Sequence, residues 1–216
     1  MFKRRILELS LEQVKIDVTG SRNTRTRQHV VTAALTWPRP AIAERFSVKT
    51  LEFVHHVADL SQSDWTTKIL FKEIVLGPFG LEVSVTEPLS VGQIDDFLKF
   101  MGSSILKLAG AEAGDLVTSP IGTGLIKLPF AFLSKMVSSS NKKPVKVIGA
   151  GHVDLSADDN WKTGRLVRLD IPLITPETIY GTVRNRKHGE LSTRRCTLLK
   201  AGRQNGVAVV TARLYD

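Results

Sequence analysis

Much of the chain alternates hydrophobic and polar residues with a period of two, the pattern of strands that bury one face. In the first such run Leu7, Leu9 and Leu11 share one phase, and from Val14 onward the hydrophobic residues take the other phase. A slip of this kind would move half of the strand to the wrong face. We therefore predict a bulge near Glu12–Gln13 that restores a single buried face.

Further alternating runs are bounded by glycine, proline and polar clusters, which favour turns. A tight hairpin is predicted at Gly77–Gly80. The predicted strands cover residues 31–37, 51–57, 67–75, 81–85, 145–155, 165–175, 178–184, 194–200 and 207–214. About ten short strands with few helices between them predict a mainly β fold, a two-sheet antiparallel sandwich of the jelly-roll kind.

Residues 90–141 have a different, helical pattern. Ser90–Gln93 has the form of a capping box, and hydrophobic residues from Ile94 to Leu108 recur at helical spacing. A second helix, hydrophobic nearly all round, is predicted to end near Val137. The chain therefore reads as one domain, residues 1–216, with a helical pair inserted at about 90–141 between β halves 1–89 and 142–216.

Two segments share a motif of histidine, Asp-Leu-Ser and tryptophan: residues 56–65 and residues 152–161. The repetition predicts two equivalent hairpins, each followed by a strand that starts at its tryptophan. His55 and His56 fall on a predicted strand, where neighbours point to opposite faces. A zinc site that joins His56 to His152 would need the two hairpins to meet.

Both copies of the motif are rich in oxygen ligands of the kind that calcium prefers. If the hairpin tips share one end of the sandwich, their carboxylates converge; the candidate ligands are Asp59, Asp64, Asp154, Asp158 and Asp159. In loop composition and strand count this arrangement resembles C2 domains, β-sandwiches that dock on membranes through calcium. The resemblance implies a C2-like sandwich and calcium as the cofactor. Alternatively, these residues are turn formers that bond their own backbone.

The chain carries a formal net charge of +9 and has a pI of about 9.8, which favours acidic partners. The candidate residues for binding lipid or another anion are Lys127, Lys135, Lys142, Lys143, Arg184, Arg186 and Lys187. Nucleic acid is the weaker prediction, because aromatic residues make up only 6% of the chain and none is interleaved with these arginines. The single cysteine, Cys196, excludes an intramolecular disulfide.

No catalytic motif is recognised, so a non-catalytic role is favoured; the alternative, an enzyme of unrecognised type, would need His56, His152 and the aspartates in one pocket. Its basic start lacks the hydrophobic run of a signal peptide, and a cytoplasmic, membrane-peripheral location is expected. The leading hypothesis is a peripheral membrane or lipid-binding module that uses basic segments and the helical insertion, assisted by calcium. The alternative is a scaffold that docks a protein partner through the insertion. The oligomeric state stays open.

Overall fold

A computed structural model describes residues 4–19, 28–38, 45–90, 92–96, 99, 145–158, 161–187 and 190–216, with the backbone alone for 183–187 and 190–193. The described elements are β1 (Arg4–Ile16), β2 (Gln28–Thr36), β3 (Arg45–Glu52), β4 (Val57–Asp59), α1 (Trp65–Lys68), β5 (Ile69–Leu76), β6 (Pro78–Thr86), β7 (Val147–Ser156), β8 (Val167–Ile174), β9 (Ile179–Lys187), β10 (Glu190–Leu199) and β11 (Gln204–Tyr215).

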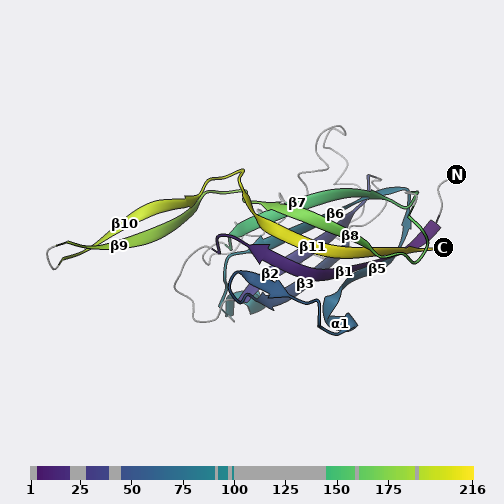
Figure 1. Cartoon of the computed structure of the whole chain (residues 1–216), viewed down its shortest axis with the longest axis horizontal. Helices are drawn as coiled ribbons and strands as arrows, with labels where there is room; N and C mark the ends of the chain where they lie inside the picture. Colours follow the sequence, from purple (N-terminus) through teal and green to yellow (C-terminus); the bar gives the residue numbers. More distant parts are fainter. Residues whose placement is uncertain are drawn as a thin grey trace.

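Nine of these strands form a single antiparallel sheet in the order β3-β2-β6-β7-β8-β11-β1-β4, with β5 also pairing β1. The mainly β, antiparallel prediction is confirmed. The prediction of a two-sheet sandwich is not confirmed, because strand pairing runs without a break from β3 to β1 and the sheet curls into a nearly closed barrel (Figure 1). Both halves of the chain contribute strands to this one sheet.

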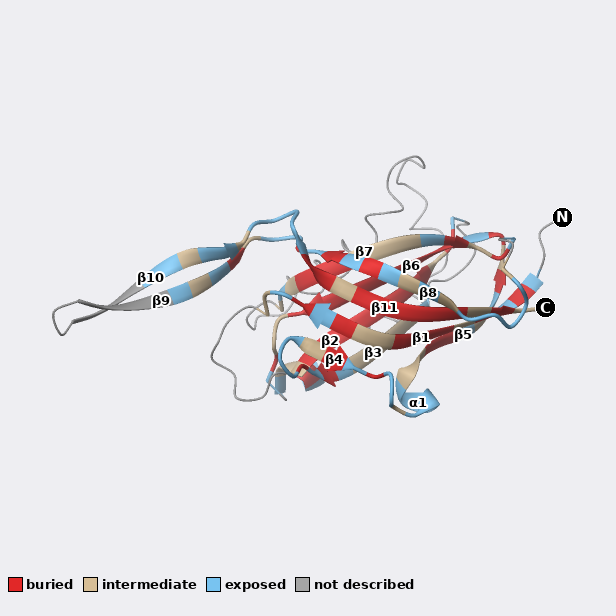
Figure 2. Ribbon diagram, viewed as in Figure 1, coloured by how far each residue is buried: buried red, intermediate tan, exposed pale blue. Residues whose placement is uncertain are grey.

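The hydrophobic core fills the inside of the curled sheet (Figure 2). Alternate residues of β1 and β11, such as Leu7, Leu9 and Leu214, have no exposed surface. The weakest pairing in the sheet is between β7 and β8, which pair only at Ala150 and Ile174. There a Cβ added to Gly151 would lie 2.3 Å from the backbone oxygen of Pro172, so the close approach of the two strands requires glycine.

The bulge predicted in β1 is confirmed. The pairing of β1 with β11 shifts between Leu11 and Gln13, so Glu12 is the extra residue. Its carboxylate accepts hydrogen bonds from the Lys68 ammonium and the Thr211 hydroxyl, both at 3.0 Å. The bulge thus restores the buried face and connects β1 to α1 and β11.

The prediction of a hairpin at Gly77–Gly80 is wrong. β5 pairs with β1, whereas β6 pairs with β2 and β7, so Gly77 is a corner at which the chain changes its position in the sheet. Gly77 has a φ of 68°, a left-handed conformation that glycine adopts without strain. Pro78 then stands at the first position of β6, where proline is tolerated.

The two free edges of the sheet approach each other at β3 and β5, where side chains rather than a backbone ladder bridge them. Arg45 of β3 forms an ion pair with Glu73 of β5 at 3.8 Å, and the Lys49 ammonium donates to the backbone oxygen of Thr67. Burial lowers the pKa of Lys49 from its ordinary value. The polar seam holds the barrel nearly closed.

The prediction of one strand through residues 51–57 is wrong, because His55 and His56 form a two-residue turn between β3 and β4. Val54 and Val57 exchange backbone hydrogen bonds of 2.9 and 3.0 Å around it. Both histidines have positive φ, 49° and 71°, as in a type I′ turn. Such turns match the twist of the flanking strands, which explains why the chain reverses here although neither residue is glycine.

Replacing His55 by Asn and His56 by Gly should raise the free energy of unfolding by about 1 kcal/mol, because side chains disfavour left-handed backbone and Asn-Gly is the preferred type I′ pair. Urea unfolding of the double variant and of each single variant measures the effect. A loss of stability would show that contacts of the imidazole rings outweigh the backbone strain.

Candidate binding surface at the arm end

Four connections of the sheet meet at one end of the barrel, which we call the arm end. In the register of the sheet, the end of β1 lies beside the start of β11, and the start of β11 lies beside the end of β8. The start of β2 lies beside the ends of β3 and β6, and the end of β6 lies beside the start of β7. The connecting segments are therefore residues 17–27, 53–56, 87–146 and 175–203. Both chain termini lie at the opposite end (Figure 1).

The last of these connections is a two-stranded arm, β9 and β10, that projects from the barrel (Figure 1). The arm pairs only with itself and not with the nine-stranded sheet. Near its root the side chain of Leu198 packs over Gly181, where an added Cβ would meet it at 2.7 Å. The arm is therefore a ribbon held at one end, and on one of its faces the described side chains Tyr180, Thr182, Arg195 and Thr197 are all exposed.

The root of the arm is anchored by Asn205, whose side chain is fully buried. Its oxygen accepts from the backbone N–H of Val18 at 2.8 Å, and its nitrogen donates to the backbone oxygens of Val18 at 3.0 Å and Ile148 at 2.7 Å. One carboxamide thus joins β11 to β7 and to the segment that follows β1. The next residue, Gly206, has a φ of 131°, and a Cβ there would lie 1.9 Å from the backbone oxygen of Lys15.

A second set of contacts closes the root between the two strands of the arm. The N–H of Thr175 donates to the backbone oxygen of Arg203 at 2.9 Å, and the N–H of Gly202 donates to the oxygen of Thr175 at 2.8 Å. The buried Thr175 hydroxyl donates to the oxygen of Glu177 at 2.6 Å. These hydrogen bonds join the segment that leads into the arm to the segment that leads out of it.

A small hollow lies beside the root, between the start of β7 and the start of β9. Burial raises the pKa of Glu87 from its ordinary value of 4.5, and nearby Lys146 acts in the opposite direction. The hollow is lined by Glu87, Lys146, Val147, Ile148, Glu177, Thr178, Ile179 and Tyr180.

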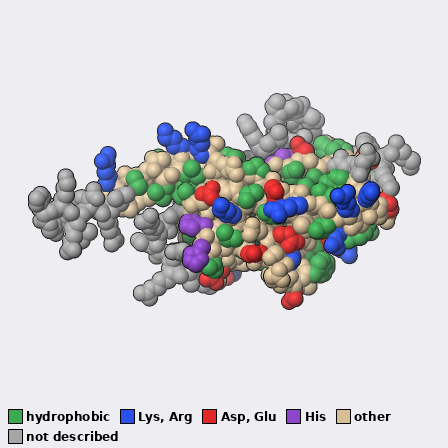
Figure 3. All heavy atoms as spheres, in the orientation of Figure 1, with side chains coloured by type: hydrophobic (Ala, Val, Ile, Leu, Met, Phe, Trp, Pro, Cys, Tyr) green, Lys and Arg blue, Asp and Glu red, His purple; other side chains and the backbone are tan. Residues whose placement is uncertain are grey.

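The arm and its root carry a concentration of positive charge. Residues 175–203 contain seven lysines and arginines against two acidic residues, a net charge of +5. Figure 3 shows basic side chains along one side of the arm.

The arm also places an aromatic ring among its arginines. The guanidinium carbon of Arg195 lies 3.7 Å from the centroid of the Tyr180 ring, in a cation–π contact. The two residues are 15 positions apart in the sequence, but the register pairs Arg195 with Thr182 and Thr197 with Tyr180. Sequence reasoning missed this pair because only the register of the hairpin reveals it.

The two copies of the histidine motif adopt different structures, so the prediction of a repeated hairpin is wrong. The first copy contains the turn at His56 and the helix that starts at Trp65, whereas His152 lies within β7. Trp65 is 53% exposed, and Trp161 is half-buried against the core. In the sheet order β1, β11 and β8 separate β4 from β7.

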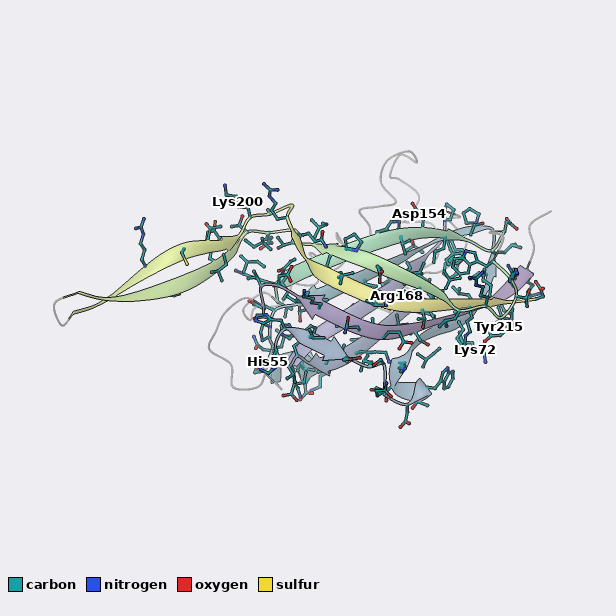
Figure 4. The ribbon with its side chains drawn as sticks, in the orientation of Figure 1. His55, Lys72, Asp154, Arg168, Lys200 and Tyr215 are labelled. Carbon is teal, nitrogen blue, oxygen red and sulfur yellow. The ribbon has the colours of Figure 1, made fainter. Side chains whose placement is uncertain are left out.

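The candidate calcium ligands are likewise spread over the barrel. Asp59 of β4 accepts from the N–H of Ser61 at 2.9 Å, a hydrogen bond that lowers its pKa, whereas Asp154 of β7 contacts His152 at 2.8 Å. Figure 4 shows Asp154 and His55 on opposite sides of the barrel. Asp64 precedes α1 without a side-chain cap, and Asp158 follows β7. Within the described residues no three His, Cys, Asp or Glu side chains form a metal-binding group; Asp159 lies outside them.

The predicted anion-binding residues are described only in part. Lys127, Lys135, Lys142 and Lys143 lie outside the described residues, as does most of the helical insertion. The backbone of Arg184, Arg186 and Lys187 belongs to β9. In the described part of the chain, no helix has the length and hydrophobicity needed to cross a membrane.

The beginning of the insertion is described and follows the prediction. The side-chain oxygen of Gln93 accepts from the backbone N–H of Ser90 at 3.0 Å, which is one half of a capping box. Residues 92–96 are helical, and Ile94 is buried against Val30 and Leu89 on the outside of the barrel. The insertion therefore begins on the outer surface of β2.

Replacing Asn205 by alanine should lower the free energy of unfolding by about 2–4 kcal/mol, because three backbone groups lose their buried partner. Chemical denaturation measures the loss. Replacing the neighbouring, exposed Gln204 by alanine serves as the control and should cost less than about 1 kcal/mol. Equal losses for the two variants would contradict the role of the Asn205 carboxamide.

Replacing Glu87 by Gln should stabilise the protein increasingly as the pH rises from about 4.5 towards 7. The pKa of Glu87 is higher in the folded state, so the stability that its proton contributes is present below pH 4.5 and is lost as pH rises through the raised pKa. Thermal unfolding at several pH values tests this. A variant less stable than the parent at pH 7 would show that the Lys146 charge outweighs burial.

No protein-family model matches the chain, and no curated protein matches its sequence.

Proposed function

We propose that this protein is a binding module that holds nucleic acid at its arm end, through the phosphate backbone. The observation that carries the proposal is the charge of the projecting arm with its root, a net +5 over residues 175–203, with seven basic residues against two acidic ones. Positive charge gathered in one region of a protein is the electrostatic footprint of a polyanion site. The arm therefore offers such a partner a basic surface that projects from the barrel (Figure 1).

The shape of the arm supports an elongated partner rather than a small anion. A two-stranded antiparallel ribbon is narrow enough to lie along a nucleic-acid strand or in a groove. Arg194 is exposed on β10, and Lys200 and Arg203 are exposed at the root of the arm. Arginine suits phosphate because its planar group can donate two hydrogen bonds to a phosphate group. Lys200 stands where the arm joins the barrel, so basic groups continue from the ribbon to its root (Figure 4).

Nucleic acid is preferred over an anionic membrane because of the composition of the exposed arm. A membrane-inserting surface presents several large hydrophobic side chains beside its charges. Among the described side chains of β9 and β10, the exposed large hydrophobic residues are Tyr180 and Leu198, and Leu198 packs over Gly181. The sequence argument against nucleic acid, the absence of an aromatic among the arginines, no longer holds once Tyr180 lies under Arg195.

Binding at the arm needs no calcium. Docking through calcium in the manner of C2 domains requires carboxylates from several loops at one place. Asp59 and Asp154 lie on strands that β1, β11 and β8 separate. A membrane partner and a protein partner that docks on the insertion stay as alternative outcomes of the experiment below.

Replacing Arg194, Lys200 and Arg203 together by alanine should weaken binding to a fluorescent oligonucleotide and reduce its salt dependence. Each lost phosphate contact should lower the slope of log K against log salt concentration by about 0.7–0.9. Fluorescence anisotropy at several salt concentrations measures both quantities. The control replaces Lys72, Lys162 and Arg165, exposed residues of the barrel away from the arm, by alanine and should leave binding nearly unchanged.

Sedimentation with anionic and neutral vesicles completes the experiment. Binding to anionic vesicles without binding to oligonucleotides would replace the proposal by the membrane hypothesis. Equal losses for the two triple variants would show that binding follows overall charge and not the arm. Absence of binding to both polyanions would favour a protein partner.

A further inference from the structure

We infer that Arg195 and Tyr180 form a stacking platform for an unpaired base, so that the nucleic acid held by the arm is single-stranded. This inference rests on the proposed function and specifies its substrate class. It arises from the one place in the described arm where an aromatic ring and a guanidinium group are in contact. Phosphate contacts alone do not distinguish single strands from duplexes.

The geometry provides a ready-made surface. With its guanidinium carbon 3.7 Å from the ring centroid, Arg195 covers one face of Tyr180, at a separation typical of stacked planar groups. Arg195 is exposed, and Tyr180 is 43% exposed. The side of the guanidinium group that faces away from the ring is therefore open to a further planar group. Both aromatic rings and arginine planes serve as stacking partners for splayed bases.

The surroundings leave room for a base. The register places Thr182 opposite Arg195 and Thr197 opposite Tyr180, and both threonines are exposed. These short side chains cannot fold over the stacked pair, and their hydroxyl groups can bond a base edge or a phosphate. Arg194, next to Arg195 in β10, is exposed on the opposite face of the ribbon, so it is a basic residue of the same arm that is not part of the platform. Bases inside a duplex are already stacked and cannot reach such a platform without unpairing.

A purely structural role for the pair makes a different prediction. If the cation–π contact only stiffened the arm, its loss would weaken single-strand and duplex binding alike, through a less ordered set of phosphate contacts. If the pair stacks a base, its loss would reduce single-strand affinity and leave duplex affinity unchanged. The ratio of the two affinities therefore separates the two roles.

The test compares oligo(dT) and oligo(dA) of 20 nucleotides with a duplex of the same length, by fluorescence anisotropy with the full chain. The parent protein should prefer the single strands. Tyr180→Ala should weaken single-strand binding by roughly tenfold or more and duplex binding little, since stacking is lost and no charge changes. Tyr180→Phe keeps the ring and should bind like the parent.

Arg195→Lys preserves the charge but removes the planar group, so it should lower the preference for single strands while the salt slope stays unchanged. Arg194→Ala is the matched control at the neighbouring position; it should reduce the salt slope by nearly one and keep the preference. Far-UV circular dichroism of each variant confirms that the barrel remains folded.

Two results would overturn the inference while the proposed function stands: equal affinity of the parent for single strands and duplex, or a Tyr180→Ala variant that keeps the full preference. If the parent binds no oligonucleotide at all, the proposed function itself fails. The two failures are thus distinguishable within one set of measurements.

Discussion

The buried carboxamide of Asn205 is the interaction on which the arm end depends. It forms hydrogen bonds with the backbone N–H and oxygen of Val18 and with the backbone oxygen of Ile148. These bonds fix three connections of the sheet at the place where the arm joins the barrel. Gly206 makes this possible, because any side chain there would collide with the backbone of Lys15. Together with the Thr175 hydrogen bonds, this junction fixes the start of β11, where the ribbon joins the barrel.

A rigid root matters because the arm has no core of its own. Two-stranded ribbons are at best marginally stable in water, and stability normally comes from packing against another layer. Here β9 and β10 pair only with each other, and at their base Ile179 and Leu199 pack against the core of the barrel. The free energy that orders the base of the arm therefore comes from the barrel, through this packing and the Asn205 and Thr175 hydrogen bonds. The exposed side chains of the ribbon are left available to a partner.

The sequence predicts what depends on local alternation and misses what depends on register. The bulge at Glu12 follows from the phase slip in β1, and the second-half strands lie close to their predicted ranges. The corner at Gly77 and the turn at His55 were mispredicted because pairing partners, not local composition, decide whether a glycine-rich or an alternating segment is a hairpin, a corner or a strand. For the same reason two similar motifs gave false evidence of a repeat.

The candidate site likewise depends on register and topology more than on local sequence. Basic residues in 184–203 are visible in the sequence, but their significance depends on three facts of topology. The segment forms a projecting ribbon, its root joins the barrel where β8 ends and β11 starts, and its register brings Tyr180 under Arg195. Under the proposed function, the basic arm would attract a polyanion and orient it along the ribbon. The folded barrel therefore acts as the rigid base from which the charged ribbon projects.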